Sequence, residues 1–325
     1  MIKGTLDNLE TSNSWAPHNE RPPIAVELAP EGILAASLSA DKRSLTCSFL
    51  ELSDGDLLSG YAEANIRNPA AIAQALRGAV APFSSQIGSS VSIIIPDSAA
   101  RVFILPFESL PTDRAELESL LRFRLRKLAR FDVDTATLDF QVFPSESKID
   151  TQASSAFRVL AVIVPSAIVL NYESVVRSAG FQPGALLPST LASLRAFNFA
   201  EGAILVNVSS CMLTTCIGSG NELMLYRAVE LPMDHRSRIE EVERSLAVSV
   251  AWYEDRFGTP PERFCYNGCL QKGEEPAILP RHSISTLLTC NDDARPNWLG
   301  LAAVIGALGA GVPQTPPILP PAHSS

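Results

Sequence analysis

The sequence lacks any apolar segment long enough to target or anchor a chain in a membrane. Its first residues contain no apolar core for a signal peptide, and their Asn, Ser and Pro content is typical of a disordered leader, which we place at residues 1–22. The best membrane candidate, Trp298–Val312, falls short of the roughly 20 residues that a span needs. We therefore expect a buried terminal helix there, no direct membrane span, and a disordered Pro-rich tail at residues 313–325.

The sequence also lacks the patterns of common catalytic and metal sites. None of its six cysteines forms a CxxC pair, and no histidine stands near Cys265 and Cys269, which could share a helix face. The four histidines lie far apart, no nucleophile-elbow serine accompanies them, and no GxxxxGK[ST] loop occurs. We expect no metal site, no ordinary P-loop, and reduced cysteines that serve in packing.

Charge is sparse and mostly acidic. Charged residues make up 19% of the chain and hydrophobic residues 46%, which is typical of a folded globular protein. The net charge of -9 gives no overall attraction to nucleic acid or anionic lipid, although a local basic patch stays open. A length of 325 residues favours about two domains.

Two similar β-hairpin segments open the two halves of the chain. Residues 24–40, IAVELAPEGILAASLSA, predict a strand, a tight turn and a second strand. Residues 204–231 repeat this pattern, with a Ser-rich turn, and continue through a Gly-Ser-Gly-Asn turn into a third strand. The repeat indicates a duplicated fold, with domains at residues 23–200 and 201–312.

Strand and helix signals alternate along the rest of the chain, as in an α/β protein. We expect further strands at residues 45–52, 91–96, 101–106, 137–143, 157–164 and 264–268. We expect helices at residues 69–81, 112–130, 166–179, 188–199 and 237–257.

The helix expected at residues 112–130 has an unusual pattern. Thr112 is placed to cap it, acidic residues occupy its first turns and basic residues its last, which suits the helix dipole. Arg124 falls on the apolar stripe, where a buried arginine needs a partner. The stripe comprises Leu117, Leu120, Leu121, Leu125 and Leu128.

Residues 91–143 resemble the signature region of PilM, the actin-like cytoplasmic protein of type IV pilus assembly. A strand ending in Pro, an apolar strand, a helix with an aromatic residue in its second half, and the strand LDFQV follow one another in the order of that family. RVLAVIVP…AGFQP and the segment 299–308 extend the similarity along most of the chain. The cytoplasmic domain of the type II secretion protein GspL is the nearest alternative. The resemblance implies an actin-like, ribonuclease H-like duplicated fold of two domains, each with a mixed sheet flanked by helices, plus an inserted subdomain at about 91–156.

In the actin-like fold, each hairpin wraps one side of a nucleotide's phosphates, so the resemblance also assigns a nucleotide cleft. Glu27 takes the first carboxylate position, but Ala29 and Pro30 replace residues that would approach the phosphate, and Pro30 has no N–H to donate. Asn207 stands where the family has Asp, and Ser209 where it has Gly. Hydroxyl donors remain at Ser210 and Thr214, and the adenosine-side turn keeps Asn267 and Gly268.

These departures predict a degenerate cleft with no catalytic residues, which binds no cofactor or binds ATP and Mg²⁺ weakly. The alternative is an empty cleft, in which Glu27 and Asn207 are ordinary polar residues at strand ends. An active actin-fold ATPase or a small-molecule kinase is the competing function.

The resemblance further implies a scaffold of a type IV pilus or related secretion assembly, at the inner face of the inner membrane. Such proteins hold the N-terminal cytoplasmic peptide of PilN in a groove beside the inserted subdomain, and connect it to pilus motor components. We place candidate partner-binding residues at Phe123 and Arg124, with Arg122 and Arg126 beside them. A solvated helix face explains the last two equally well, and some other membrane partner is a third possibility.

Overall fold

The computed structural model describes residues 21–38, 45–58, 60, 65–86, 90–144, 157–197, 199, 202–220, 222–268, 284–287 and 301–309. Apart from Arg21 and Pro22, the expected leader lies outside these residues, as does the expected tail. Within the described helices, no segment combines the length and the apolar composition that crossing a bilayer requires.

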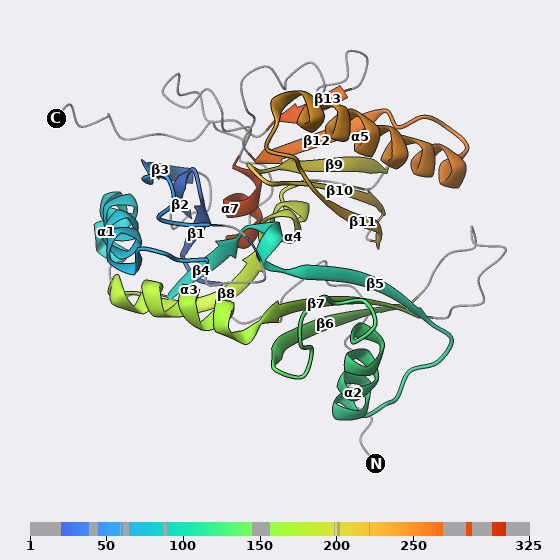
Figure 1. Cartoon of the computed structure of the whole chain (residues 1–325), viewed down its shortest axis with the longest axis horizontal. Helices are drawn as coiled ribbons and strands as arrows, with labels where there is room; N and C mark the ends of the chain where they lie inside the picture. The colour runs from blue at the N-terminus through green and yellow to red at the C-terminus, as the bar shows by residue number, and fades with distance from the viewer. Residues whose placement is uncertain are drawn as a thin grey trace.

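The first half of the chain forms a five-stranded sheet in the order β3-β2-β1-β4-β8 (Figure 1). β1 (Ile24–Ala29), β2 (Gly32–Leu38) and β3 (Leu45–Glu51) are antiparallel, whereas β4 (Ser90–Ile95) and β8 (Gln182–Pro188) run parallel to β1. β1 and β4 are apolar on both faces because both faces of this sheet are covered.

The second half repeats this topology strand for strand, in the order β11-β10-β9-β12-β13. β9 (Ala203–Val208), β10 (Met212–Ser219) and β11 (Glu222–Glu230) are antiparallel, and β12 (Arg263–Gly268) and β13 (Ile284–Leu287) run parallel to β9. The duplication that the repeated hairpins predict is therefore confirmed.

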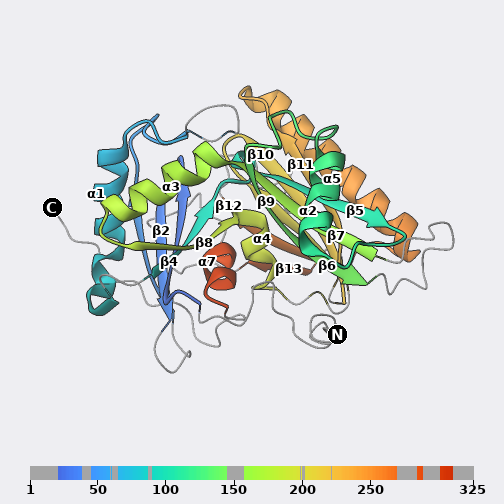
Figure 2. The same ribbon diagram turned by 90° about the horizontal axis from the view of Figure 1, so that it is seen from below.

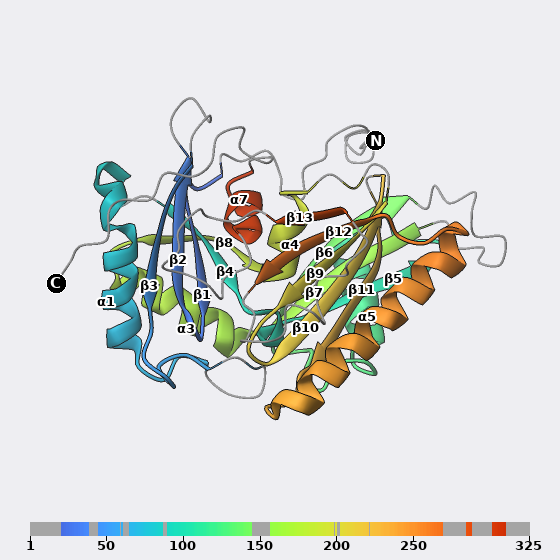
Figure 3. The same ribbon diagram turned by 90° about the horizontal axis from the view of Figure 1, so that it is seen from above.

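Helices on the outer faces close the core of each half, as Figures 2 and 3 show. α1 (Pro69–Val80) and α3 (Ser166–Ser178) pack side chains such as Leu76 and Tyr172 onto the first sheet. α5 (His235–Phe257) covers the second sheet with Val242, Leu246 and Tyr253. It ends at Gly258, whose φ of 72° closes a left-handed cap, at the position that the sequence indicates.

Two short helices lie between the two sheets, α4 (Ser189–Leu194) and α7 (Ala302–Ala307). Their core contains residues from both halves, including Ala25 of β1, Leu205 of β9 and Cys265 of β12. Arg21 also reaches α7 and donates to the carbonyl oxygen of Gly306 at 2.8 Å. The expected terminal helix is thus present, shorter than predicted, and joins both domains.

A three-stranded antiparallel sheet, in the order β5-β7-β6, carries α2 (Arg114–Leu125) on one face (Figure 1). Its strands are β5 (Arg101–Phe107), β6 (Ala136–Pro144) and β7 (Phe157–Pro165). The inserted subdomain therefore spans 101–165 and not 91–156. β4 pairs with β1 in the first sheet, and β7 is the central strand of the inserted sheet.

Three expectations about α2 are wrong. The N-cap is Asp113 and not Thr112, because the Asp113 carboxylate accepts bonds from the amides of Ala115 and Glu116. Arg124 is exposed, with its guanidinium 4.1 Å from the centre of the Phe107 ring and donating to the Pro106 carbonyl oxygen. The α-helix ends at Leu125, so Leu128 leaves the stripe and is 50% exposed.

The strands β8 and β13 were not predicted from the sequence. β8 contains Pro183 and Pro188, which normally argue against a strand. It lies at the edge of the first sheet, where a residue without an N–H is tolerated.

Candidate functional site

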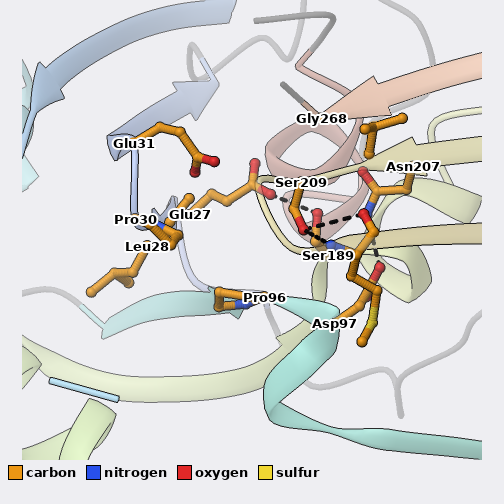
Figure 4. A pocket seen from close by; sticks show the side chains of 13 residues that line it. Glu27, Leu28, Pro30, Glu31, Pro96, Asp97, Ser189, Asn207, Ser209 and Gly268 are labelled. Carbon is orange, nitrogen blue, oxygen red and sulfur yellow. Dashed lines mark hydrogen bonds between the residues drawn. The ribbon is translucent and has the colours of Figure 1, made fainter. Parts of the chain in front are cut away.

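The carboxyl ends of β1, β4, β9 and β12 converge in a cleft between the two halves (Figure 4). β1 brings Glu27, β9 brings Asn207, β12 brings Gly268, and the turn after β4 brings Asp97. Ser189, the first residue of α4, completes the wall. In doubly wound sheets this edge is where ligands bind, so the topology selects it as the candidate site.

Asp97 is the centre of a buried hydrogen-bond network that the sequence did not reveal. Its Oδ1 accepts from the Thr190 amide at 3.0 Å. Its Oδ2 accepts from the Thr190 hydroxyl and, at 2.9 Å, from Asn207 Nδ2. Both carboxylate oxygens are thus engaged by donors of the protein itself, one of which comes from the other half of the chain.

Asn207 is therefore more than a neutral replacement for an aspartate. Its Nδ2 also reaches Thr190 Oγ1 at 2.8 Å, and its Oδ1 accepts from Asn267 Nδ2 at 3.0 Å. An aspartate here could donate to neither Asp97 nor Thr190 and would face the Asp97 carboxylate with a like charge. The amide of Asn207 donates to the Asp97 carboxylate and adds no negative charge beside it.

Glu27 lies at the other wall of the cleft and is only 5% exposed. Its Oε1 accepts from the Ser189 hydroxyl at 2.6 Å, whereas its Oε2 has no hydrogen-bond partner in the described part of the chain. Burial raises the pKa of Glu27 to about 7, against the lowering effect of the Ser189 bond, and the nearby Asp97 and Glu31 charges raise it further. Near neutral pH, Glu27 is consequently protonated in about half of the molecules.

The tips of the two hairpins contact each other across the cleft. Ser210 donates its backbone N–H to Glu31 Oε1 at 3.2 Å, so an internal carboxylate takes the amide that a phosphate would use. Arg238 of α5 is fully buried and donates to the carbonyl oxygens of Ser209 at 2.8 Å and Ser210 at 2.5 Å. Arg238 therefore holds the turn between β9 and β10 from the side of α5.

The cavity enclosed by these residues has a volume of about 30 Å³, which is room for about two water molecules. Sites for small molecules usually measure about 300–1,000 Å³. The polar groups match Mg-ATP no better, because Pro30 offers no N–H, the Ser210 amide already donates to Glu31, and both oxygens of Asp97 already accept bonds from the protein. In this closed arrangement the residues do not fit a magnesium nucleotide.

The predicted cleft residues divide into two groups. Glu27, Ala29, Pro30, Asn207, Ser209 and Gly268 line the cavity. Asn267 lies directly behind it, Ser210 forms the hairpin tip, and Thr214 is buried on β10 beside Asn207. Gly268 has φ of 101°, and a Cβ there would lie 1.9 Å from the Val208 carbonyl oxygen, so close backbone approach of β9 and β12 requires this glycine.

The residues missed from the sequence are Asp97, Ser189, Thr190, Glu31 and Arg238. A signal for the first two was present, because each follows a proline at the end of an apolar strand, in IIIPD and LLPS. The resemblance that assigned Glu27 to the cleft was not carried over to them. Arg238 carried no such signal, since its place on α5 resembles that of any helix arginine.

The candidate partner-binding residues lie on and just after α2. Arg122 is bound to Glu118 at 2.9 Å and to the carbonyl oxygens of Val133 and Ala136, so it anchors the loop before β6. Arg126 forms a two-pronged pair with Asp134. Phe123 differs from these arginines, because its side chain is 58% exposed, with Lys127 Nζ lying 5.8 Å from its ring centre.

Cysteine and metal chemistry find no support among the described residues. No group of three or more His, Cys, Asp or Glu side chains is placed there to hold a metal ion. Cys47, Cys216 and Cys265 are buried, and Cys211 is partly buried. Burial raises the pKa of Cys216 well above its usual value and that of Cys265 to about 11, as expected of packing residues. Cys269, Cys290 and His282 lie outside the described residues.

Comparison with known proteins gives structural matches and no sequence match. No family model and no curated protein matches the chain. A structure described as the PilM-PilN type IV pilus biogenesis complex aligns with a TM-score of 0.68 and 14% identity, over 90% of this chain and 98% of that one. The cytoplasmic domain of EpsL, from the type II secretion system of Vibrio cholerae, gives 0.48 and 13%, over 88% and 92%. A Bacteroides thetaiotaomicron protein with an actin-like ATPase fold gives 0.48 and 12%, over 89% and 96%. The chain thus has the actin-like fold that the sequence predicts, and its resemblance to PilM holds at the level of the fold.

Proposed function

We propose that this chain is a scaffold of a type IV pilus or related secretion assembly and that it does not hydrolyse ATP. The observation that carries the proposal is the alignment with the PilM-PilN structure over 90% of this chain and 98% of that one. The small volume of the cleft and the internal bonds of Asp97 and Glu31 support the non-enzymatic part. We place the protein in the cytoplasm, at the inner face of the inner membrane, where a membrane partner recruits it and pilus motor components can contact it.

We propose that the partner is a PilN-like inner-membrane protein, whose short N-terminal cytoplasmic peptide docks beside the inserted subdomain. Phe123 is the best anchor, because exposed aromatic side chains dominate the energetics of interfaces and the neighbouring arginines are engaged within the subdomain. Arg124 keeps its cation–π contact with Phe107 and supports this face.

Peptide binding tests this assignment. A labelled N-terminal peptide of the PilN-like protein encoded in the same genome should bind the full chain in a fluorescence anisotropy titration. Phe123→Ala should weaken binding by about tenfold or more. Leu170→Ala is the matched control, because Leu170 is equally exposed on α3, outside the inserted subdomain. Equal weakening by both variants, or no binding, would count against a PilN-like partner.

The cleft has its own test. Isothermal titration with Mg-ATP should give weak binding or none, and a phosphate-release assay should give no turnover. The competing function, an ATPase or small-molecule kinase, is favoured by one observation: Glu27 lines the cavity, and its Oε2 has no hydrogen-bond partner among the described residues. That function requires measurable turnover, which Glu27→Ala should abolish.

A further inference from the structure

A second and much larger cavity lies outside the cleft, between the inserted subdomain and the second half of the chain. It measures about 610 Å³, within the range of ligand-binding sites. One wall is the start of β5, with Arg101, Val102 and Phe103, and the other is the end of β11, from Tyr226 to Glu230. Leu128 and Arg130, which follow α2, close one side. We call this the β5–β11 groove.

Both walls are edge strands of their sheets. Among the residues that the structure describes, β5 pairs only with β7 and β11 pairs only with β10. The two strands contact each other, and Figure 1 shows β5 passing beneath β11. An edge strand presents unpaired N–H and C=O groups, which are a template for another strand. Proteins commonly exploit such edges to bind extended peptides.

The groove is positively charged, although the protein as a whole carries a net charge of -9. Three arginines line it, Arg101, Arg130 and Arg227, against one carboxylate, that of Glu230, and of the three Arg227 also donates to the carbonyl oxygen of Ser245 on α5 at 3.4 Å. Arg101 and Glu230 approach to 3.8 Å across the groove, a long ion pair that an incoming carboxylate can replace. Arg130 is exposed and forms no ion pair or hydrogen bond with the described residues.

Apolar side chains lie between these charges. Leu128 is half exposed, and Phe103 and Val229 are partly exposed at the groove walls. An extended strand alternates its side chains between two faces, so one face can meet the arginines while the other meets these apolar groups. A segment paired along residues 226–230 would extend over about 16 Å.

We propose that the β5–β11 groove binds an extended, acidic segment of a partner protein, which adds as a strand to the free edge of β11. Main-chain hydrogen bonds supply affinity and the arginines select acidic side chains. This site is separate from the face around Phe123, and its occupancy does not depend on a pilus assignment.

Binding of a model peptide to the full chain tests the groove. The probe is a fluorescein-labelled octapeptide of alternating Glu and Val, titrated by anisotropy at low salt. It should bind saturably, and affinity should fall as salt rises. Arg130→Glu should weaken binding by about tenfold or more, because it reverses a charge with no partner inside the protein. Arg130→Ala should change affinity in the same direction by less, and thermal melts should confirm that both variants fold.

Three controls distinguish peptide binding in the β5–β11 groove from non-specific electrostatic attraction. Arg236→Glu makes the same charge change at an exposed site on α5 and should leave binding unchanged. A Lys–Val octapeptide should not bind. Proline at alternate positions of the Glu–Val peptide removes the N–H groups needed for strand pairing and should abolish binding.

Other outcomes would overturn the proposal. Saturable binding that Arg130→Glu does not weaken would place the peptide elsewhere. Undiminished binding of the proline-containing peptide would exclude strand addition. If the Glu–Val peptide fails to bind and sedimentation reveals a dimer that Arg130→Glu dissociates, the occupant is a second copy of this chain.

Discussion

Glu27 shows how one buried carboxyl group links the cleft to pH. Its environment raises its pKa from 4.5 to about 7. Below pH 4.5 it is protonated in both the folded and the unfolded state. Between pH 4.5 and 7 it ionises in the unfolded chain and stays protonated in the folded one, so its ionisation lowers stability as pH rises. Above pH 7 the loss is constant.

Glu27→Gln removes this titration and keeps an oxygen that can accept the Ser189 bond. Relative to the wild type, the variant should therefore gain stability as pH rises from 4.5 to 7, by roughly 3 kcal/mol in total. Urea unfolding of both proteins at pH 4.5, 6 and 8 measures this difference, and the subtraction cancels groups that are too far from Glu27 to sense its charge. A difference that is constant with pH would contradict the raised pKa.

Asn207 tests whether the cleft can be returned to an acidic, nucleotide-type pattern. Asn207→Asp should destabilise the fold by about 3 kcal/mol at pH 7, because it removes a buried donor to Asp97 and adds a like charge. The loss should shrink at low pH, where a protonated carboxyl can donate again. Thermal denaturation at pH 5 and pH 8 measures both effects, and ATP turnover should remain absent. A stable variant with ATPase activity would show that the network is dispensable.

The contact between the short helices α4 and α7 depends on one glycine. A Cβ at Gly306 would lie 1.9 Å from the Ala192 carbonyl oxygen, which is backbone and cannot move aside cheaply. Gly306→Ala should therefore destabilise the protein by about 2 kcal/mol or more, although alanine favours a helix by itself. Denaturant unfolding measures the change.

Gly78 of α1 is the matched control for this substitution. A Cβ there meets only the Leu50 side chain, at 2.6 Å, and Leu50 is exposed enough to move. Gly78→Ala should be neutral or stabilising by up to about 1 kcal/mol through helix propensity. Equal destabilisation by the two variants would mean that the approach of α4 to α7 is not what fixes Gly306.

At the scale of the whole molecule, contacts across the cleft connect the two halves. Besides the bond between Asp97 and Asn207, the Glu31 carboxylate holds the Ser210 amide. Glu31→Ala should free this amide, so hydrogen exchange at Ser210 should become about tenfold faster or more, while exchange within α5 stays unchanged. Glu31→Gln keeps an acceptor oxygen and should retain most of the protection. Unaltered exchange in Glu31→Ala would mean that the hairpin tips are held by other contacts.

Much of the fold could be predicted from sequence because its signals are local. Each hairpin shows apolar strands and turn residues within a few positions, and the pattern recurs in both halves. Collinear resemblance to PilM gave the actin-like fold, and strand ends located Glu27 and Asn207 in one cleft. Boundaries were less accurate where a partner decides them. β8 is a strand because β4 pairs with it. β4 belongs to the first sheet, and not to the inserted subdomain, because it pairs with β1.

The sequence alone determined the duplicated α/β pattern, the strand ends that form the cleft, and the losses at Ala29 and Pro30. Only the tertiary structure decided what Asn207 does, since its role depends on Asp97, 110 residues away in the chain. It likewise decided that Arg124 is exposed and that α7 lies between both halves. The physical reason is that burial and hydrogen-bond partners are properties of contacts between distant segments, and periodicity within one segment carries no information about them.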